Sequence, residues 1–277
     1  MRFKWLVRKK SLALVSGVLL IGIVFLAIFA DFLPLQNPLA QNIPSRFTSP
    51  GYEFFFGTDN FGRDVFSRVI YGSRSSLYIA ITSVVLGTLL GTLIGMISAY
   101  RGGWIDLVSQ RVVDMLLGFP ILVLAVFIVV ALGPSAHAVT IAIAVAVMPQ
   151  MVRLSRSRAL AVREETFILA ARALGASPLR IVLKHILPHT ISPVLTYATG
   201  YIGTALIAES ALSFLGLGVP PPYPSWGAML QEGRIYLEVA PWLTIFPGIV
   251  LSITAFSFVF LGDALRDVID PRARVHS

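Results

Sequence analysis

The sequence predicts an all-α membrane protein with six transmembrane helices, and its composition supports this prediction. Hydrophobic residues make up 56% of the 277 residues and charged residues only 13%, so the chain is more apolar than a soluble domain. The charged residues gather between uncharged runs that are long enough to cross a bilayer as helices. The chain has no cysteine, which excludes a disulfide framework and a thiolate metal site.

The first predicted element, residues 1–33, is a basic N-terminal segment followed by the first transmembrane helix. Five Lys and Arg residues stand in Met1–Lys10, and Ser11–Ala30 carries no charge. A cleaved signal peptide would show the same order of charges. Because the apolar run is longer than a signal-peptide core and no small-residue cleavage site is obvious, we predict a retained helix.

Residues 34–74 are predicted to form an extracytoplasmic segment, because they are polar and rich in turn-forming proline. Near its end, four apolar residues would share one face of a helix, with charged residues off that face: Val65, Phe66, Val69 and Ile70. This pattern predicts an interfacial helix on the outer leaflet.

Residues 75–265 are predicted to form the core of the protein, with five more transmembrane helices. The uncharged run from Met115 to Val152 is too long for one crossing of about 20 residues, so a turn at 132–135 divides it into two helices. A proline- and aromatic-rich outer loop separates the last two helices, and residues 266–277 form a short cytoplasmic tail. The expected helices of the core cover approximately residues 77–100, 115–131, 136–152, 192–215 and 241–262.

The distribution of basic residues predicts the orientation. Six helices place both termini on one side, where the segments carry 17 Lys and Arg residues against 5 on the other side. Basic residues accumulate in cytoplasmic loops. We therefore predict cytoplasmic termini and a cytoplasmic segment 163–188 in a multi-pass membrane protein. The same distribution accounts for the net charge of +8 without a nucleic-acid partner.

The segment 163–188 is the most informative part of the sequence, because it is charged although it lies between strongly apolar runs. Apolar residues recur at helical spacing on both sides of Gly175, which predicts two short amphipathic helices. Gly175 is suited to end the first helix, Ser177 and Pro178 to begin the second, and Pro188 to end it. A charged helix pair at a membrane face predicts a soluble partner. The expected apolar faces are Phe167, Ala170, Ala171 and Leu174, then Leu179, Val182, Leu183 and Ile186.

This segment resembles the EAA loop of the permease subunits of ABC importers. The resemblance lies in LAARALG at 169–175 and in Leu187 and Pro188, and the chain departs from it at Leu169, where a Glu is usual. In that family the loop forms a coupling helix that sits in a cleft of a cytoplasmic ATPase subunit. The resemblance assigns this role to Ala170, Ala171, Arg172, Gly175, Leu187 and Pro188.

Three further stretches, at 57–77, 213–230 and 261–272, resemble the second permease subunit of dipeptide, oligopeptide and nickel importers. The resemblance implies the type I transmembrane fold of ABC importers, a place in the bacterial plasma (inner) membrane and a pathway for short peptides. Nickel chelates or glutathione are the alternative substrates. The implied partners are a second, different permease subunit, two ABC ATPase subunits, an extracytoplasmic solute-binding protein and membrane lipid. The chain has no phosphate-binding loop of the G-x-x-x-x-G-K-[ST] type. ATP and Mg²⁺ are therefore expected on the ATPase subunits, with no cofactor and no catalytic residue in this chain.

Two residues toward the outer side are further candidates. Glu209, inside the predicted fifth helix, would line the translocation path or alternatively form a structural hydrogen bond to a neighbouring helix. Trp226 would belong to an outer rim that contacts the binding protein, or alternatively anchor its loop at the membrane interface. His185 and His189 have Pro188 between them and no third ligand nearby, so we predict no metal site.

Three glycines spaced four residues apart, Gly87, Gly91 and Gly95, predict close helix packing, within the subunit rather than between subunits. Other classes of protein fit the sequence less well. An ATP-independent channel would need no docking loop, and an intramembrane enzyme would need paired catalytic groups inside the helices. An exporter would not carry an importer-type loop.

Overall fold

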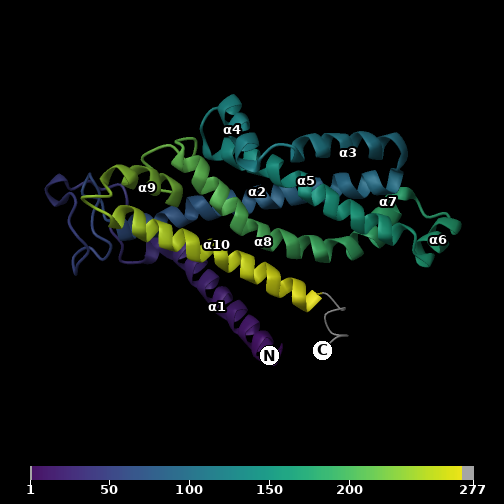
Figure 1. Cartoon of the computed structure of the whole chain (residues 1–277), viewed down its shortest axis with the longest axis horizontal. Coiled ribbons are helices and arrows are strands. Elements are labelled where there is room, and N and C mark those ends of the chain that lie inside the picture. The colour runs from purple at the N-terminus through teal and green to yellow at the C-terminus, as the bar shows by residue number, and fades with distance from the viewer. Residues whose placement is uncertain (1, 270–277) are drawn as a thin grey trace.

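The computed structural model describes residues 2–269, with side chains for residues 12–267, and this part of the chain consists of helices and loops without a β-strand. Residues 270–277, most of the predicted tail, lie outside the described residues. Figure 1 shows an elongated bundle of long helices. α1 packs mainly against α10 and points away from the rest of the bundle. The helices are α1 (Arg2–Phe29), η1 (Ala30–Phe32), η2 (Ile43–Ser45), α2 (Val65–Arg101), α3 (Gly103–Leu117), α4 (Ile121–Leu132), α5 (Ala136–Arg163), α6 (Thr166–Ala173), α7 (Pro178–Ile181), η3 (Val182–Ile186), α8 (Leu187–Phe214), α9 (Trp226–Gly233), η4 (Arg234–Tyr236) and α10 (Trp242–Ile269).

The long helices agree with the predicted all-α membrane fold. Five of the described helices are long and apolar enough to cross a membrane, and the bent pair of α3 and α4 makes a sixth span when it is counted as one. α1 begins and α10 ends on the same side of the bundle, as six spans require (Figure 1). The cytoplasmic assignment of that side stays a prediction from the basic residues.

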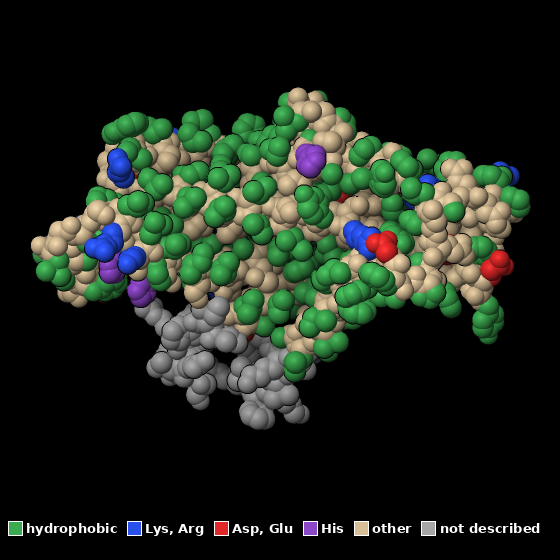
Figure 2. Space-filling view, turned by 180° about the vertical axis from the view of Figure 1, so that it is seen from behind, with side chains coloured by type: hydrophobic (Ala, Val, Ile, Leu, Met, Phe, Trp, Pro, Cys, Tyr) green, Lys and Arg blue, Asp and Glu red, His purple; other side chains and the backbone are tan. Residues whose placement is uncertain are grey.

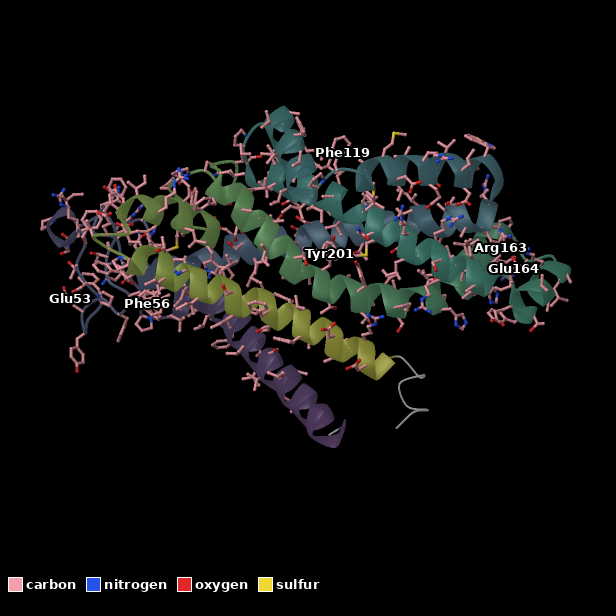
Figure 3. All side chains as sticks on the ribbon, viewed as in Figure 1. Glu53, Phe56, Phe119, Arg163, Glu164 and Tyr201 are labelled. Carbon is pink, nitrogen blue, oxygen red and sulfur yellow. The ribbon has the colours of Figure 1, made fainter. Side chains whose placement is uncertain are left out.

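The third span differs from the straight helix that we expected from residue 115 onward. The span consists of α3, which begins at Gly103, and α4. These two helices meet at an angle of 95° around Phe119, which Figure 3 labels at the bend. Two charged residues of α3 pair with α5, and hydropathy alone does not reveal such pairing. The pairs are Arg156 with Asp106 at 2.5 Å and Arg153 with Asp114 at 2.6 Å.

The predicted interfacial helix is not a separate element. Residues 65–101 form one continuous helix, α2, so the predicted boundary between residues 34–74 and 75–265 falls inside it. Asp64 caps this helix by accepting a hydrogen bond from the backbone N–H of Ser67 at 2.8 Å. Arg68, one of the charged residues expected off the apolar face, is only 1% exposed. The prediction of a separate interfacial helix was wrong. Charged side chains at this end of α2 pair with buried partners in the outer loops, so they do not have to face water.

The glycine stripe of α2 packs against α5. A Cβ atom built on Gly87, Gly91 or Gly95 would lie 2.7, 2.6 or 2.1 Å from the nearest atom of α5. Because such distances are shorter than van der Waals contact, only glycine lets the two backbones approach this closely. The stripe therefore serves packing within the subunit, as predicted. Gly203 joins α8 to α10 in the same way, since its Cβ would lie 2.4 Å from the Ala255 carbonyl oxygen.

The fifth span begins earlier than predicted. We expected Pro188 to end a helix and Pro193 to begin the next one. Instead α7 continues through a five-residue π-helix, η3, directly into α8. Pro188 directly follows the π-helix, and Pro193 lies inside a membrane helix, where local π-helical geometry and neighbouring helices make proline tolerable. The segment 163–188 is therefore joined to the fifth span without a break.

Apolar side chains are spread along the whole length of the face shown in Figure 2, and charged side chains are few there. On α1, for example, Leu14, Val18 and Ile21 are 67–72% exposed. Exposed apolar side chains on membrane-length helices face lipid or another membrane subunit. This surface belongs to a multi-pass membrane protein.

Candidate functional site

The segment 163–188 forms the tip of the bundle opposite the outer loops (Figure 1). It contains α6 as a short helix, as predicted, and α7, which continues into α8 instead of ending at Pro188. Gly175 adopts a φ of +77° just after α6. The Ser177 hydroxyl accepts a hydrogen bond from the N–H of Arg180 at 3.4 Å and caps α7. Both predicted helix-end signals are confirmed.

The residues that anchor this segment differ in part from the predicted apolar faces. Ile168, Ile181 and Ile186 are fully buried against the inner ends of α2 and α5, in a cluster with Met96 and Ala99. Sequence periodicity shows that a helix is amphipathic but not which neighbour covers which face. Of the predicted face residues, Val182 and Ile186 are buried, whereas Phe167, Leu174, Leu179 and Leu183 are exposed.

The segment 163–188 exposes apolar and basic side chains on α6, on α7 and on the residues that follow. Leu174 is 88% exposed and Leu179 is 68% exposed. Exposed leucines next to basic side chains are typical of a contact with another protein. We name this area the coupling surface, and it consists of Leu169, Arg172, Leu174, Leu179, Arg180 and Lys184. Of the other predicted site residues, Ala170, Gly175 and Pro188 are exposed, and Ala171 and Leu187 are half-buried.

Polar contacts tie this segment to the end of α2. The Arg163 guanidinium donates to the Ala99 carbonyl at 2.8 Å and pairs with Glu164 at 3.0 Å; Figure 3 labels both charged residues. The Arg172 guanidinium lies over the Tyr100 ring, 5.2 Å from its centroid. The sequence did not predict the contact of Arg163 with Ala99 or that of Arg172 with Tyr100. The two residues of each contact lie more than 60 positions apart along the chain.

Glu209 lies in α8 and has no exposed surface. The Ser213 hydroxyl donates to one carboxylate oxygen at 2.8 Å, and the Ser210 hydroxyl donates to the other at 3.2 Å. Ser76 on α2 and Ser225 at the start of α9 also lie near the carboxylate. The carboxylate is held by hydroxyls of its own helix, and the alternative prediction of a structural hydrogen bond to a neighbouring helix stays a prediction. A function of Glu209 in the translocation path stays a prediction.

We expect Glu209→Gln to lower the free energy of unfolding by about 1–3 kcal/mol, because the amide NH₂ group cannot accept the hydrogen bonds of the serine hydroxyls. An unfolding titration with SDS in mixed micelles measures this change. The matched control is Glu238→Gln, since Glu238 is exposed on the neighbouring outer loop. Equal stability of the Glu209→Gln variant and the unmodified protein would contradict the role of the carboxylate.

Trp226 lies in the core and not on an outer rim, so this prediction is corrected. Its side chain is fully buried, and its Nε1–H donates to the Val69 carbonyl at 2.9 Å. Its backbone N–H donates to the Ser76 hydroxyl at 3.1 Å. α9 packs directly on α8 because Gly227 has no side chain. A Cβ atom built on Gly227 would lie 2.6 Å from the Ser210 Cα. The Trp226 side chain offers no surface to a binding protein or to the membrane interface.

The two histidines near the tip pack against an aromatic ring. The ring centroids of His185 and His189 lie 6.3 and 5.5 Å from that of Phe167. Across residues 2–269, no three His, Cys, Asp or Glu side chains are grouped so that they could hold a metal ion. This arrangement gives the histidines a packing role beside the coupling surface.

The fold and its tip define a class of transport protein. Residues 91–275 match the family described as binding-protein-dependent transport system inner membrane component, and residues 5–50 match the N-terminal TM domain of oligopeptide transport permease C. The chain therefore belongs to the family of inner-membrane components of binding-protein-dependent transport systems. Its fold resembles a chain of the inward-facing MetNI methionine ABC transporter with a TM-score of 0.59, at 20% identity over 73% of this chain and 97% of that one.

Relatives within this family are permeases for peptides and glutathione. The dipeptide transport system permease protein DppC of Alkalihalophilus pseudofirmus is 41% identical over 96% of this chain and 88% of its own. A putative peptide transport system permease protein of Brucella suis is 43% identical over 98% and 90%. The glutathione transport system permease protein GsiD of Escherichia coli O1:K1 is 39% identical over 96% and 88%. The resemblance read from the motifs is confirmed.

Proposed function

We propose that this chain is the permease subunit of an ABC importer and forms part of the translocation pathway for short peptides. The observation that carries this proposal is the coupling surface, an exposed apolar and basic helix pair anchored to the long helices by buried isoleucines. Family membership supports transport, and the names of the relatives support peptides or a peptide-like substrate. Glutathione and nickel chelates are the alternative substrates.

The proposed mechanism is alternating access driven from the tip. Two partner ATPase subunits bind ATP and Mg²⁺, and each holds the coupling surface of one permease subunit in a cleft. When the ATPases close, they displace α6 and α7. Because α7 runs through η3 into α8, and because Ile168 packs on the ends of α2 and α5, the displacement reaches three spans at once. The pathway then opens outward to a docked solute-binding protein, and hydrolysis by the partners resets it.

The remaining partners follow from the same proposal. A second permease subunit, a different chain, completes the pathway, and both termini of this chain lie in the cytoplasm with the coupling surface. The excess of basic residues on that side supports this orientation. This chain binds neither nucleotide nor metal and contributes no catalytic residue.

The test is to isolate the tagged chain in a gentle detergent from its native membrane and to identify the bound proteins by mass spectrometry. The proposal expects a second six-span protein and P-loop ATPases. The reconstituted complex should take up a labelled dipeptide in an ATP-dependent manner, and competition with tripeptides, glutathione or a nickel chelate identifies the substrate. Repeated recovery of the chain alone, with substrate flux that needs no ATP, would favour the channel alternative.

We expect Arg172→Glu to reduce ATP-dependent uptake about tenfold, because loss of the cation–π contact and charge reversal in a contact surface together cost about 1.4 kcal/mol or more. Uptake by reconstituted vesicles measures this effect. Arg158→Glu is the matched control, since Arg158 is an exposed basic residue of α5 outside the coupling surface. Unchanged uptake by the Arg172→Glu variant would count against docking at this surface.

A further inference from the structure

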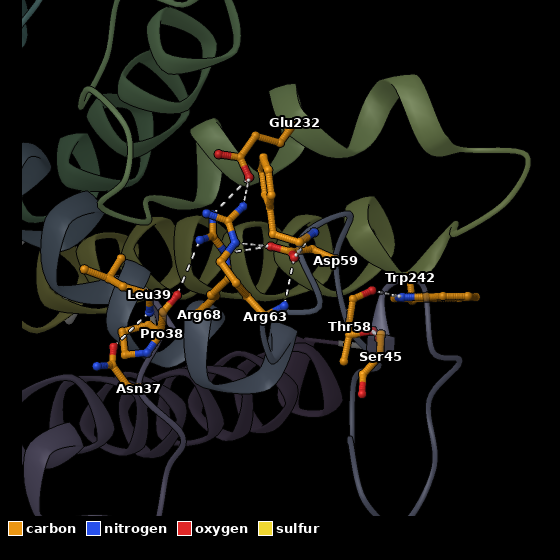
Figure 4. A network of polar contacts seen from close by, with 11 residues as sticks. Asn37, Pro38, Leu39, Ser45, Thr58, Asp59, Arg63, Arg68, Glu232 and Trp242 are labelled. Carbon is orange, nitrogen blue, oxygen red and sulfur yellow. Dashed lines mark hydrogen bonds and ion pairs between the residues drawn. The ribbon is translucent and has the colours of Figure 1, made fainter. Parts of the chain in front are cut away.

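A buried cluster of charged side chains lies at the outer end of the bundle, far from the coupling surface. Asp59, Arg63 and Arg68 are each at most 4% exposed, and Glu232 reaches them from α9 (Figure 4). We name these four residues the outer charge cluster. Charged side chains are rarely buried unless they are paired, so this arrangement needs an explanation.

The four side chains form one connected network. Arg63 binds Asp59 at 2.5 Å and Glu232 at 3.1 Å, and Arg68 binds the same Glu232 oxygen at 3.0 Å. Arg68 also lies 3.6 Å from the Asp59 carboxylate. Two cations and two anions balance, so removal of Glu232 alone would leave a buried positive charge without compensation.

The outer charge cluster joins three parts of the chain. Asp59 and Arg63 belong to the loop before α2, Arg68 lies in the outer end of α2, and Glu232 lies near the end of α9. Arg68 also approaches the Pro38 carbonyl at 3.5 Å, as Figure 4 shows. The network therefore fastens α9 to the outer loop and to α2.

The other end of α9 is held independently. There the Trp226 ring and the Trp226 backbone N–H donate the hydrogen bonds to α2 that are described above. At the cluster end, a Cβ atom on Gly233 would lie 3.0 Å from the backbone carbonyl carbon of Leu243 in α10, so the two backbones are in close contact. An eight-residue helix that is fixed at both ends has little freedom to move separately from α2.

We propose that Glu232 is a positioning residue that, through Arg63 and Arg68, makes α9 and the outer loop follow α2 as one unit during transport. α2 is a continuous helix about 55 Å long. Its inner end carries Met96 and Ala99, which pack against the segment 163–188. A displacement at the coupling surface therefore reaches the outer loops along one helix and through the outer charge cluster. This inference rests on the proposed function only where it is tested by ATP-dependent uptake.

The first test measures the position of α9 directly. The chain contains no cysteine, so Met229→Cys introduces a single thiol on α9 at a site that is 4% exposed. With the cluster intact, the thiol should react slowly with a membrane-impermeant maleimide added from outside. Because an uncompensated buried charge loosens its surroundings, adding Glu232→Gln should speed labelling at least about tenfold. Adding Glu238→Gln, which changes an exposed carboxylate on the same loop, should leave the rate unchanged.

The second test separates positioning from a general loss of structure. In the assembled transporter, Glu232→Gln should keep the bound ATPase subunits and their basal ATP hydrolysis, because the coupling surface lies at the other end of α2. ATP-dependent uptake should fall about tenfold, as expected when the outer loops no longer follow α2. Absence of ATP-dependent uptake by the unmodified complex would refute the proposed function, whereas the labelling result would still stand.

The variant Glu232→Gln with Arg63→Gln serves if the single variant does not accumulate. It removes one charge of each sign and also the link between Arg63 and α9, so we expect faster labelling than in the intact cluster. Slow labelling together with normal uptake in either variant would overturn the proposal.

Discussion

Gly91→Leu is expected to prevent the protein from accumulating in the membrane. A Cβ atom at this position would lie 2.6 Å from the Met151 Cβ and 2.7 Å from the Met148 carbonyl oxygen. Because the second atom belongs to the backbone of α5, it cannot move aside as a side chain does, and α2 must separate from α5. We expect a loss of at least about 3 kcal/mol, the upper part of the range for overpacked cores. Quantitative immunoblotting of membrane fractions measures the folded amount.

Gly22→Leu is the matched control for this prediction. Gly22 lies on α1, and a Cβ atom built there has no neighbouring atom within 4 Å. The control should accumulate normally, because the added side chain faces the membrane. Normal accumulation and stability of the Gly91→Leu variant would show that the two helices do not approach as closely as described.

Gly175→Val is expected to reduce ATP-dependent uptake about 10- to 100-fold while insertion stays normal, since a β-branched residue at positive φ costs about 1–3 kcal/mol. The glycine has a φ of +77°, and a Cβ atom there would meet no atom within 4 Å. The effect therefore acts through the backbone alone, by changing the direction in which α7 leaves α6. Uptake and substrate-stimulated ATP hydrolysis in reconstituted vesicles measure the loss of coupling.

Gly175→Asn distinguishes backbone conformation from the loss of glycine as such. Asparagine tolerates the left-handed conformation better than other residues, so this variant should retain most of the uptake. Equal uptake by the two variants would mean that the conformation of the turn does not matter for coupling.

Signals that depend only on neighbours along the chain predicted the structure well. The apolar runs predicted the long helices, and Gly175, Ser177 and Pro178 predicted the ends of α6 and α7. Helix ends can be predicted in this way because a cap satisfies backbone groups within a few residues. The same local reading was wrong for Pro188 and for the start of α3. In those places a π-helix and charge pairs with α5 allowed helices that the local pattern does not show.

The sequence by itself determined that this is an all-α membrane protein with a charged helix pair between its apolar segments, because hydropathy and charge are properties of continuous stretches. It also carried the motifs of the transport family. Only the tertiary structure decided which side chains are buried. Ile168 anchors the segment 163–188, Trp226 holds α9 against α2, and the outer charge cluster joins the other end of α9 to α2. These contacts link residues up to 169 positions apart, and burial of a polar side chain depends on the partner that a neighbouring helix brings to it.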